Sequence, residues 1–346
     1  MSENTSETDQ RQQMEELFIC DDIWYEVFAF LDPFELGLKM ALINDRLDVL
    51  VDVHFKSRKW SMGWMEIRRA IRGNGAEIIT KRLGEWLPIP QEPLPDKVIG
   101  FKGIWIDYVD QSVIEFLQRF RRLLDSSGPN VYIGTSINQS LSWDIIQQNV
   151  WPLVSDNICG LLSLDPSVLG RLRRFSPTIL RNCATLRSIH CIQLFPQFPA
   201  EDNAAASSDK ALAKWLITPR GDGLPKMLYC DFIQEGLKES FVNASEPANF
   251  IIRFLGNYRY FVPFELTNNW TGERLTFGHF NEDKWLLVRC PIEREEDKWT
   301  NWEKEAIEWQ WYHQWNRIAI IFQDSGIGDG MDEANEGSSE PKKPKK

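Results

Sequence analysis

The stretch that decides the fold runs from Ile19 to Leu36 and reads ICDDIWYEVFAFLDPFEL. Six of its apolar residues step by four, one, three, one and three positions, which is the spacing of a wide apolar stripe on one face of an α-helix. These residues are Ile19, Ile23, Trp24, Val27, Phe28 and Leu31. Asp21 and Asp22 fall in the first turn, where carboxylates interact favourably with the helix dipole. Pro33 ends the helix, because the residue before a proline is excluded from the α region.

The order of these residues resembles the opening of the F-box, the small three-helix module that docks on the Skp1 adaptor of cullin-RING ubiquitin ligases. The match runs without a gap from Ile19 to Leu36. It continues through LINDRL at 42–47, which is similar to the leucine-valine-asparagine-arginine segment of the family, and on to about Phe55. The resemblance covers roughly 40 of the 346 residues. The whole chain resembles divergent nematode F-box-like proteins, in which a long α/β region follows the F-box.

The resemblance implies a three-helix module over 17–57, with helices near 20–31, 34–43 and 46–55. It also implies a set of Skp1-binding residues, which the sequence cannot divide between the core of the module and its interface. They are Ile19, Cys20, Ile23, Trp24, Val27, Phe28, Leu31, Pro33 and Leu36. One departure concerns Cys20, because the family has a proline there. Its loss removes a preset backbone angle in the first turn and part of an adaptor contact.

Composition narrows the class of protein. Hydrophobic residues make up 43% of the chain, enough for a substantial core, and the net charge of −11 disfavours nucleic acid as a partner. No run of 18 apolar residues exists for a membrane span, and the polar start of the chain is unlike a signal peptide. We therefore expect a cytoplasmic or nuclear protein with reduced thiols and no membrane partner. The final PKKPKK is compatible with a nuclear localisation signal or with a plain solvated end.

The remaining chain divides into five segments. Residues 1–15 are predicted to be disordered, 58–97 to be a linker with a proline-rich connector, and 324–346 to be a disordered tail. Residues 98–235 carry strand-like pieces marked by Ile104, Ile133, Leu161, Ile189 and Met227, at steps of 29, 28, 28 and 38 residues. Helical apolar stripes lie between these pieces, a pattern that resembles an irregular leucine-rich-repeat-like βα stack. An ordinary βα sandwich is the alternative.

Residues 236–323 have a different pattern, typical of a small α+β cap. We expect a helix over 247–255, three strands of an antiparallel meander up to Cys290, a helix over 296–313 with His313 at its C-terminus, and a closing strand at 318–322. The predicted fold class is thus multidomain α+β and α/β: a three-helix module, a βα stack and a meander with a helix.

The sequence contains no recognisable catalytic motif, since Walker, Gly-x-Ser-x-Gly and His-Glu-x-x-His patterns are all missing. Cys183, His190 and Cys191 lack the spacing of metal ligands, so no metal and no cofactor is expected. We predict a non-catalytic substrate receptor of an SCF-type ubiquitin ligase. Its partners would be a Skp1-like adaptor, a cullin held through that adaptor, and an unidentified target protein. The alternative is a scaffold or inhibitor that has lost Skp1 docking, and an enzyme would need a site hidden in the α/β region.

Candidate target contacts are the aromatic residues Trp105, Tyr108, Tyr132 and Trp270. Trp105 lies between Ile104 and Ile106, so the alternation of a strand directs it to the face opposite these two side chains.

Overall fold

The computed structural model describes residues 19–31, 36, 40–57, 60–80, 86–93, 98–232, 236–255, 262–281 and 284–331. The chain separates between Lys59 and Trp60 into two compact units. The predicted disordered start at 1–15 lies outside the described residues, as does the tail from 332 onward.

The N-terminal unit contains α1 (Asp21–Phe28) and α3 (Asp45–Ser57). Cys20 is the N-cap of α1, and Asp21 and Asp22 lie in its first turn, as predicted. The side chain of Asn44 caps α3 by accepting a hydrogen bond of 2.9 Å from the backbone N–H of Leu47. The helix expected at 34–43 falls mostly outside the described residues, of which this range includes only 36 and 40–43.

The core of this unit contains side chains from both helices and from Leu36 between them. Phe28, Leu36, Leu47, Leu50 and Val51 are buried. His54 of α3 is buried as well, with only 1% of its surface exposed. Its ring stacks on Tyr25 at 5.9 Å and meets Phe28 edge-on at 5.4 Å. His54 therefore faces α1 and lies in the same aromatic cluster as Phe28.

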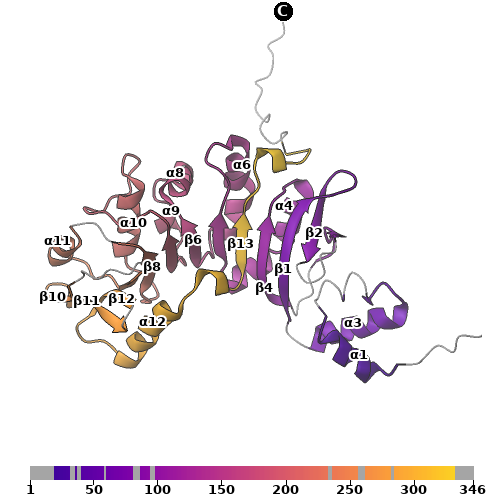
Figure 1. Cartoon of the computed structure of the whole chain (residues 1–346), viewed down its shortest axis with the longest axis horizontal. Coiled ribbons are helices and arrows are strands. Elements are labelled where there is room, and N and C mark those ends of the chain that lie inside the picture. The colour runs from indigo at the N-terminus through magenta and orange to yellow at the C-terminus, as the bar shows by residue number, and fades with distance from the viewer. Residues whose placement is uncertain are drawn as a thin grey trace, which may run out of the picture. The chain divides into compact units, whose positions relative to one another are not determined.

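The second unit is built on one thirteen-stranded sheet with the order β10-β11-β12-β9-β8-β7-β6-β5-β13-β4-β1-β2-β3 (Figure 1). Its strands are β1 (Trp60–Arg69), β2 (Ala76–Thr80), β3 (Trp86–Pro88), β4 (Val98–Ile106), β5 (Asn130–Ile133), β6 (Gly160–Leu164), β7 (Ser188–Cys191), β8 (Lys226–Cys230), β9 (Phe250–Phe254), β10 (Phe264–Asn268), β11 (Glu273–Asn281), β12 (Lys284–Pro291) and β13 (Arg317–Ile320). The strands from β9 to β1 in this order are parallel to their neighbours, and antiparallel pairs extend both ends.

Helices follow most of the parallel strands. They are α4 (Gln111–Arg119), α5 (Arg121–Ser127), α6 (Ser140–Ile145), the π-helix η2 (Ile146–Val150), α7 (Trp151–Val154), α8 (Pro166–Phe175), α9 (Ile179–Asn182), α10 (Ser208–Ile217), α11 (Leu237–Val242), α12 (Glu296–Glu308) and the 3₁₀ turns η3 (Trp311–His313) and η4 (Asp324–Gly326). Short polar residues start several of them: Asp110 accepts from the N–H of Val113 at 3.0 Å, and Asp165 from that of Val168 at 2.9 Å.

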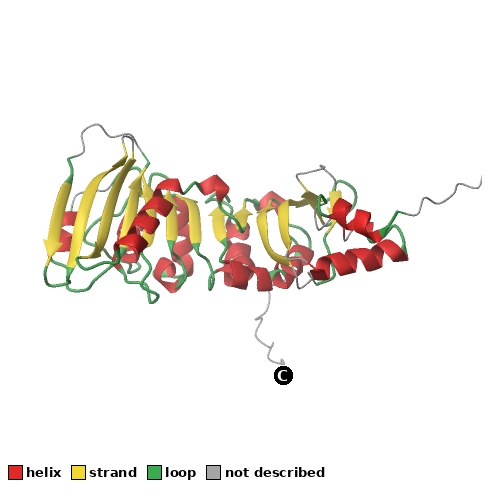
Figure 2. Cartoon of the chain, turned by 90° about the horizontal axis from the view of Figure 1, so that it is seen from below, coloured by secondary structure: helices red, strands yellow, loops and turns green. Residues whose placement is uncertain are grey.

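One face of the sheet carries a straight row of buried apolar residues, one from each of eight adjacent strands. In register order they are Ile104, Ile318, Val131, Leu161, Ile189, Leu228, Ile252 and Leu287. The crossover helices pack on this face, as the layer of helices beneath the strands in Figure 2 illustrates. The helix α5 contacts β4, and Nζ of Lys226 in β8 donates to the carbonyl of Trp215 in α10. Along the chain from β5 to β9, each new strand lies next to the preceding strand, and the sheet grows in one direction. Because such crossovers are right-handed, their helices all fall on one face of the sheet.

The other face carries α12 over one part only. Trp299, Ala306 and Ile307 of α12 pack on Met227, Tyr229 and Ile251 of the sheet. Toward β5, β13, β4 and β1 the same face presents Trp64, Trp105, Tyr132 and Arg317, of which the three aromatic side chains are half-buried. We call this part of the sheet, from β5 to β1, the open face.

Three domain boundaries expected from the sequence are wrong. Residues 58–97 are not a linker, since β1, β2 and β3 extend the sheet. Residues 236–323 are not a separate cap, since β9 pairs with β8 and β12 with β9. The tail does not begin at 324, because η4 and a bridge between Val109 and Ile327 continue the folded unit.

Three local expectations also need correction. The expected helix over 247–255 is the strand β9, and the expected helix over 296–313 ends at Glu308, so His313 lies in a 3₁₀ turn. The five marker residues do lie in β4 to β8, but β4 and β5 are not neighbours. The closing strand β13 is inserted between them, and it pairs in parallel with both.

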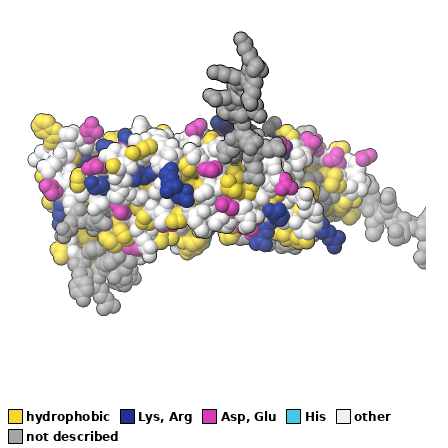
Figure 3. Space-filling model, turned by 90° about the horizontal axis from the view of Figure 1, so that it is seen from above, with side chains coloured by type: hydrophobic (Ala, Val, Ile, Leu, Met, Phe, Trp, Pro, Cys, Tyr) yellow, Lys and Arg dark blue, Asp and Glu magenta, His cyan; other side chains and the backbone are white. Residues whose placement is uncertain are grey.

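The surface shown in Figure 3 mixes acidic and basic side chains with small hydrophobic patches. Within the described residues, no helix combines the length and the apolar character that a membrane crossing requires.

Candidate docking surface

The apolar stripe of α1 divides into a buried side and an exposed side. Phe28 is buried against α3, whereas Ile19, Ile23 and Val27 are exposed at intervals of one helical turn; Ile23 is 51% exposed. Phe30 follows just beyond the helix and is 71% exposed. Three to four large apolar side chains therefore face solvent along one side of a single short helix.

More exposed apolar residues occur in the segments that follow. Leu42 and Ile43 precede α3, and Val49 and Val53 lie one turn apart on it. Single exposed apolar residues are ordinary, but so many in one small unit are typical of a surface that another molecule covers. We call Ile19, Ile23, Val27, Phe30, Leu42 and Ile43 the docking residues.

The structure distributes the nine residues predicted from the sequence over three environments. Phe28 and Leu36 are in the core, Trp24 and Leu31 are half-buried, and four are exposed: Ile19, Cys20, Ile23 and Val27. Pro33 lies outside the described residues. Phe28 and Leu36 are therefore packing residues rather than surface contacts.

The start of α1 is held by the side chain of Arg46. Its Nη2 donates to the backbone carbonyl of Ile19 at 2.7 Å and to the carboxylate of Asp21 at 2.5 Å. Both partners are solvent-exposed, so the ion pair contributes little net stability, but it positions Ile19 beside the first turn of the helix.

The backbone at Cys20 has φ −67° and ψ 155°. A proline ring fixes φ near this value, so the main chain already has the conformation that a proline would impose. The departure from the F-box pattern at Cys20 therefore does not reflect a different backbone.

Sequence reasoning missed Phe30, Leu42 and Ile43 as surface residues. Phe30 lies off the helical stripe in the quoted stretch, and Leu42 and Ile43 were noted only as part of a motif. A signal was present, since each is a large apolar residue outside the helical spacing. Only the folded arrangement shows that they remain uncovered by the described part of the unit.

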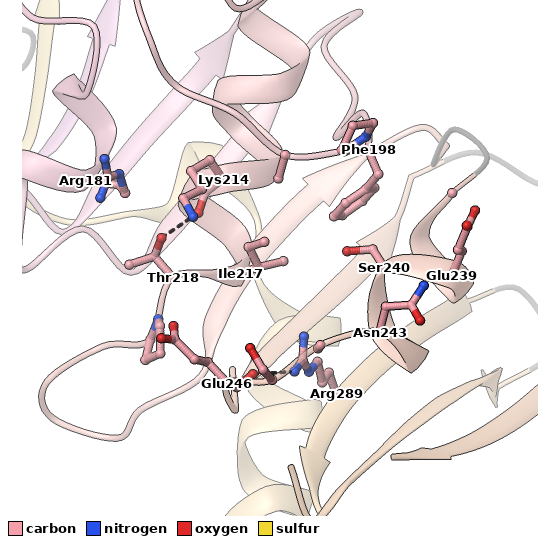
Figure 4. A pocket seen from close by; sticks show the side chains of 16 residues that line it. Arg181, Phe198, Lys214, Ile217, Thr218, Glu239, Ser240, Asn243, Glu246 and Arg289 are labelled. Carbon is pink, nitrogen blue, oxygen red and sulfur yellow. Dashed lines mark hydrogen bonds between the residues drawn. The ribbon is translucent and has the colours of Figure 1, made fainter. Parts of the chain in front are cut away.

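A cavity of about 640 Å³ lies in the second unit, beside α10 and α11 (Figure 4). Two of its three basic side chains are already paired: Arg181 with Asp202, and the buried Arg289 with Glu273 at 2.6 Å. Its described lining contains no histidine or cysteine.

Ser163 and His190 form the pair most similar to a catalytic dyad. The Ser163 hydroxyl lies 3.4 Å from Nδ1 of His190, and Ser163 has φ +53°. The same Nδ1 accepts the backbone N–H of Ser163 at 3.2 Å, at a register shift between β6 and β7. His190 thus satisfies a donor that the irregular ladder releases, which explains both the geometry and the unusual backbone.

The cysteines are free thiols, four of them buried. Burial raises the pKa of Cys159 to about 11 and that of Cys183 to about 12, so both stay protonated and weakly reactive. Among the described residues no cluster of three or more His, Cys, Asp or Glu side chains is arranged to hold a metal ion.

The four aromatic residues predicted as target contacts differ in exposure. Tyr108 is buried and beneath the guanidinium of Arg69, so it is not a surface contact. Trp105 and Tyr132 are half-buried on the open face, and Trp270 is 83% exposed at the turn between β10 and β11.

No model of a protein family, no curated protein and no solved structure matches this chain.

Proposed function

We propose that the chain is the substrate-recognition subunit of an SCF-type E3 ubiquitin ligase. In this proposal the N-terminal unit is an F-box that docks a Skp1-like adaptor, and through it a cullin. The second unit, viewed as an irregular leucine-rich-repeat-like region, binds a target protein. Such a receptor needs no catalytic residue, because it raises the local concentration of the target beside an enzyme carried by other subunits.

The observation that carries the proposal is the exposed side of α1. The residues that resemble the F-box supply a helix that buries Phe28 and leaves Ile19, Ile23 and Val27 exposed. Leaving large apolar side chains in water forgoes about 1.5–3 kcal/mol each. An amphipathic helix laid into a partner's groove recovers this free energy, which supports a helical or grooved adaptor as the partner.

Binding of the full chain to recombinant Skp1 tests the proposal. The Ile23→Asp/Val27→Asp double variant should bind the adaptor with an affinity lower by about 100-fold or more, because two charges would be buried at the interface. Both positions are exposed, so circular dichroism should show an unchanged fold.

The matched control is Ile71→Asp, which changes an exposed isoleucine of the second unit and should bind as the wild type does. Equal binding by the double variant and the wild type would refute docking through α1.

The second candidate function is a scaffold or inhibitor that does not dock Skp1, and Cys20 motivates it. If the wild type fails to bind, Cys20→Pro is the variant to examine. The backbone at Cys20 already suits proline, so the variant should fold and gain about 0.4–1 kcal/mol from reduced freedom of the unfolded chain. Skp1 binding by Cys20→Pro alone would support the scaffold function for the natural chain.

A further inference from the structure

The segment that joins α12 to β13 exposes an unusual number of aromatic side chains. Residues 309–315 read WQWYHQW. Trp311, Tyr312 and Trp315 are 42%, 50% and 57% exposed. Tryptophan and tyrosine at this density on one short segment are the side chains that protein interfaces use as central anchors.

This segment leads directly into the open face. Asn130 of β5 donates its side-chain N–H to the carbonyl of Trp315 at 3.0 Å. The next strand residue, Arg317, is in register with Gly103 on one side and with Asn130 on the other. Trp64 occupies the space above Gly103, since a Cβ there would lie 2.2 Å from Cζ3 of the indole.

Arg317 is a buried cation that has no anionic partner in the described part of the chain. It is 6% exposed and forms no ion pair with any described residue. Its Cζ lies 5.0 Å from the ring centre of Trp64 and 5.2 Å from that of Trp311. Its single hydrogen bond within the described chain, from Nη1 to the carbonyl of Tyr312, is long at 3.5 Å, and its Nε is unsatisfied.

Burial without a counter-ion is costly for a guanidinium, and it lowers the pKa of Arg317. Arg289, which is buried to a similar extent, pairs with the carboxylate of Glu273 at 2.6 Å. Arg317 is therefore the position on this surface where a carboxylate of another molecule would gain most binding free energy.

We propose that Trp311, Tyr312, Trp315 and Arg317 form a docking surface for an extended peptide segment that presents an Asp or Glu side chain beside apolar side chains. The carboxylate completes the planar fork of Arg317, and the aromatic rings cover the flanking apolar groups. A single-stranded nucleic acid would also stack on aromatic rings, but it requires a row of cations, and the chain is acidic overall.

The inference names the kind of target segment that the proposed ligase receptor would recognise, so its biological role rests on that function. Its test does not, because it uses no adaptor. Loss of peptide binding and loss of Skp1 binding are measured separately and can fail separately.

Random peptides displayed on phage, selected on the immobilised full chain, supply the probe. The enriched peptides should share an acidic residue next to Leu, Met or an aromatic residue. A labelled synthetic copy of the most enriched peptide is then titrated against each protein variant by fluorescence anisotropy.

Arg317→Gln should weaken binding by about 30-fold or more, the effect of removing one partner of a buried charge pair. Replacing the acidic residue of the peptide by its amide should do the same, and the two losses should not add. Trp311→Ala/Tyr312→Ala should weaken binding by about 10-fold. Both side chains are exposed, so this variant should fold and can test the inference even if Arg317→Gln does not fold. Phe280→Ala, which truncates an aromatic side chain of β11 that is 42% exposed, is the matched control and should bind as the wild type does.

Three outcomes would overturn the inference. They are enriched peptides that lack an acidic residue, binding that survives both the Arg317→Gln and the Trp311→Ala/Tyr312→Ala changes, and a selection that enriches no peptide. Displacement of the labelled peptide by a polyuridine oligonucleotide, with tighter binding of the oligonucleotide, would assign the surface to nucleic acid instead.

Discussion

The helices α1 and α4 are amphipathic and nearly equal in length, with eight and nine residues, yet their apolar stripes end in different environments. In α4, Val113, Ile114, Phe116 and Leu117 are all buried. In α1 only Phe28 is. The spacing of apolar residues predicts a helix with a stripe, but it does not say whether the chain itself supplies the surface that covers the stripe.

The apolar stripes of α1 and α4 differ in exposure because the two units differ in how many elements can cover a helix. The helix α4 contacts α5 and η2, and Phe116 packs on Phe120, whose ring meets Phe101 of β4, so several elements of the large unit cover its stripe. The described part of the N-terminal unit offers α1 little besides α3, and one helix covers only part of a wide stripe. In our proposal, the adaptor covers the part of the α1 stripe that the N-terminal unit leaves exposed.

The largest effect that tests this comparison is expected in α4. Phe116 is buried and packs on Phe120 with ring centres 4.9 Å apart. Phe116→Ala should lower the free energy of unfolding by about 3–5 kcal/mol, because it removes apolar contact and leaves a cavity. Urea denaturation of the full chain measures the change. A loss below about 1 kcal/mol would mean that the stripe of α4 is not tightly covered.

An intermediate effect is expected from Lys226, which lies on the covered face of the sheet. Its Nζ donates to the carbonyl of Thr218 at 2.6 Å, and burial, with the nearby positive charges of Arg220 and Arg181, lowers its pKa to about 7. The unfolded chain keeps this proton up to about pH 10, so between about pH 7 and 10 the unfolded state binds more protons. Stability should therefore rise with pH in this window, by at most about 1.4 kcal/mol per pH unit.

Lys226→Met removes that proton. Relative to the wild type, its free energy of unfolding should be most favourable below about pH 7 and should lose this advantage toward pH 10. Urea titrations at several pH values compare the two slopes. Parallel slopes would show that burial does not lower the pKa of Lys226, and this face of the sheet would then be less well covered than the structure shows.

The smallest effect is expected on the exposed side of α1. Ile23→Ser should change the free energy of unfolding by no more than about 0.5 kcal/mol, since the side chain has little contact to lose. Thermal unfolding measures this value. A loss above about 2 kcal/mol would erase the contrast with α4, because it would show that Ile23 is covered in the isolated chain.

Local pattern predicted much of the second unit and failed at particular places. The strands around Ile104, Ile133, Leu161, Ile189 and Met227 were found because each is a short apolar run between helical stripes. The strand β9 was taken for a helix because a run such as Phe250–Phe254 has no period that separates the two structures. The sequence predicts a linker over residues 60–69 because they precede a proline-rich connector, and the pairing of β1 with β4 that makes them a strand joins residues distant in sequence.

The candidate site was predictable only as a segment. The sequence pattern indicates that α1 carries an apolar stripe, but the division between Phe28 inside and Ile23 outside depends on where α3 lies. The aromatic surface around Arg317 was not predicted at all. It depends on β13 lying beside β4, a pairing between residues such as Ile318 and Ile104 that no local pattern encodes.

The placement of β13 also bears on how the protein is made. A chain emerging from the ribosome presents β4 and β5 long before Arg317 to Ile320 exist, and until then the two strands have a gap between them that nothing else described fills. The sheet can therefore join its two halves only after Arg317 to Ile320 have been synthesised, and contacts this distant in sequence form slowly. A ribosome that stalls before Arg317 would release a nascent chain with two unpaired strand edges, which is a substrate for chaperones and for aggregation.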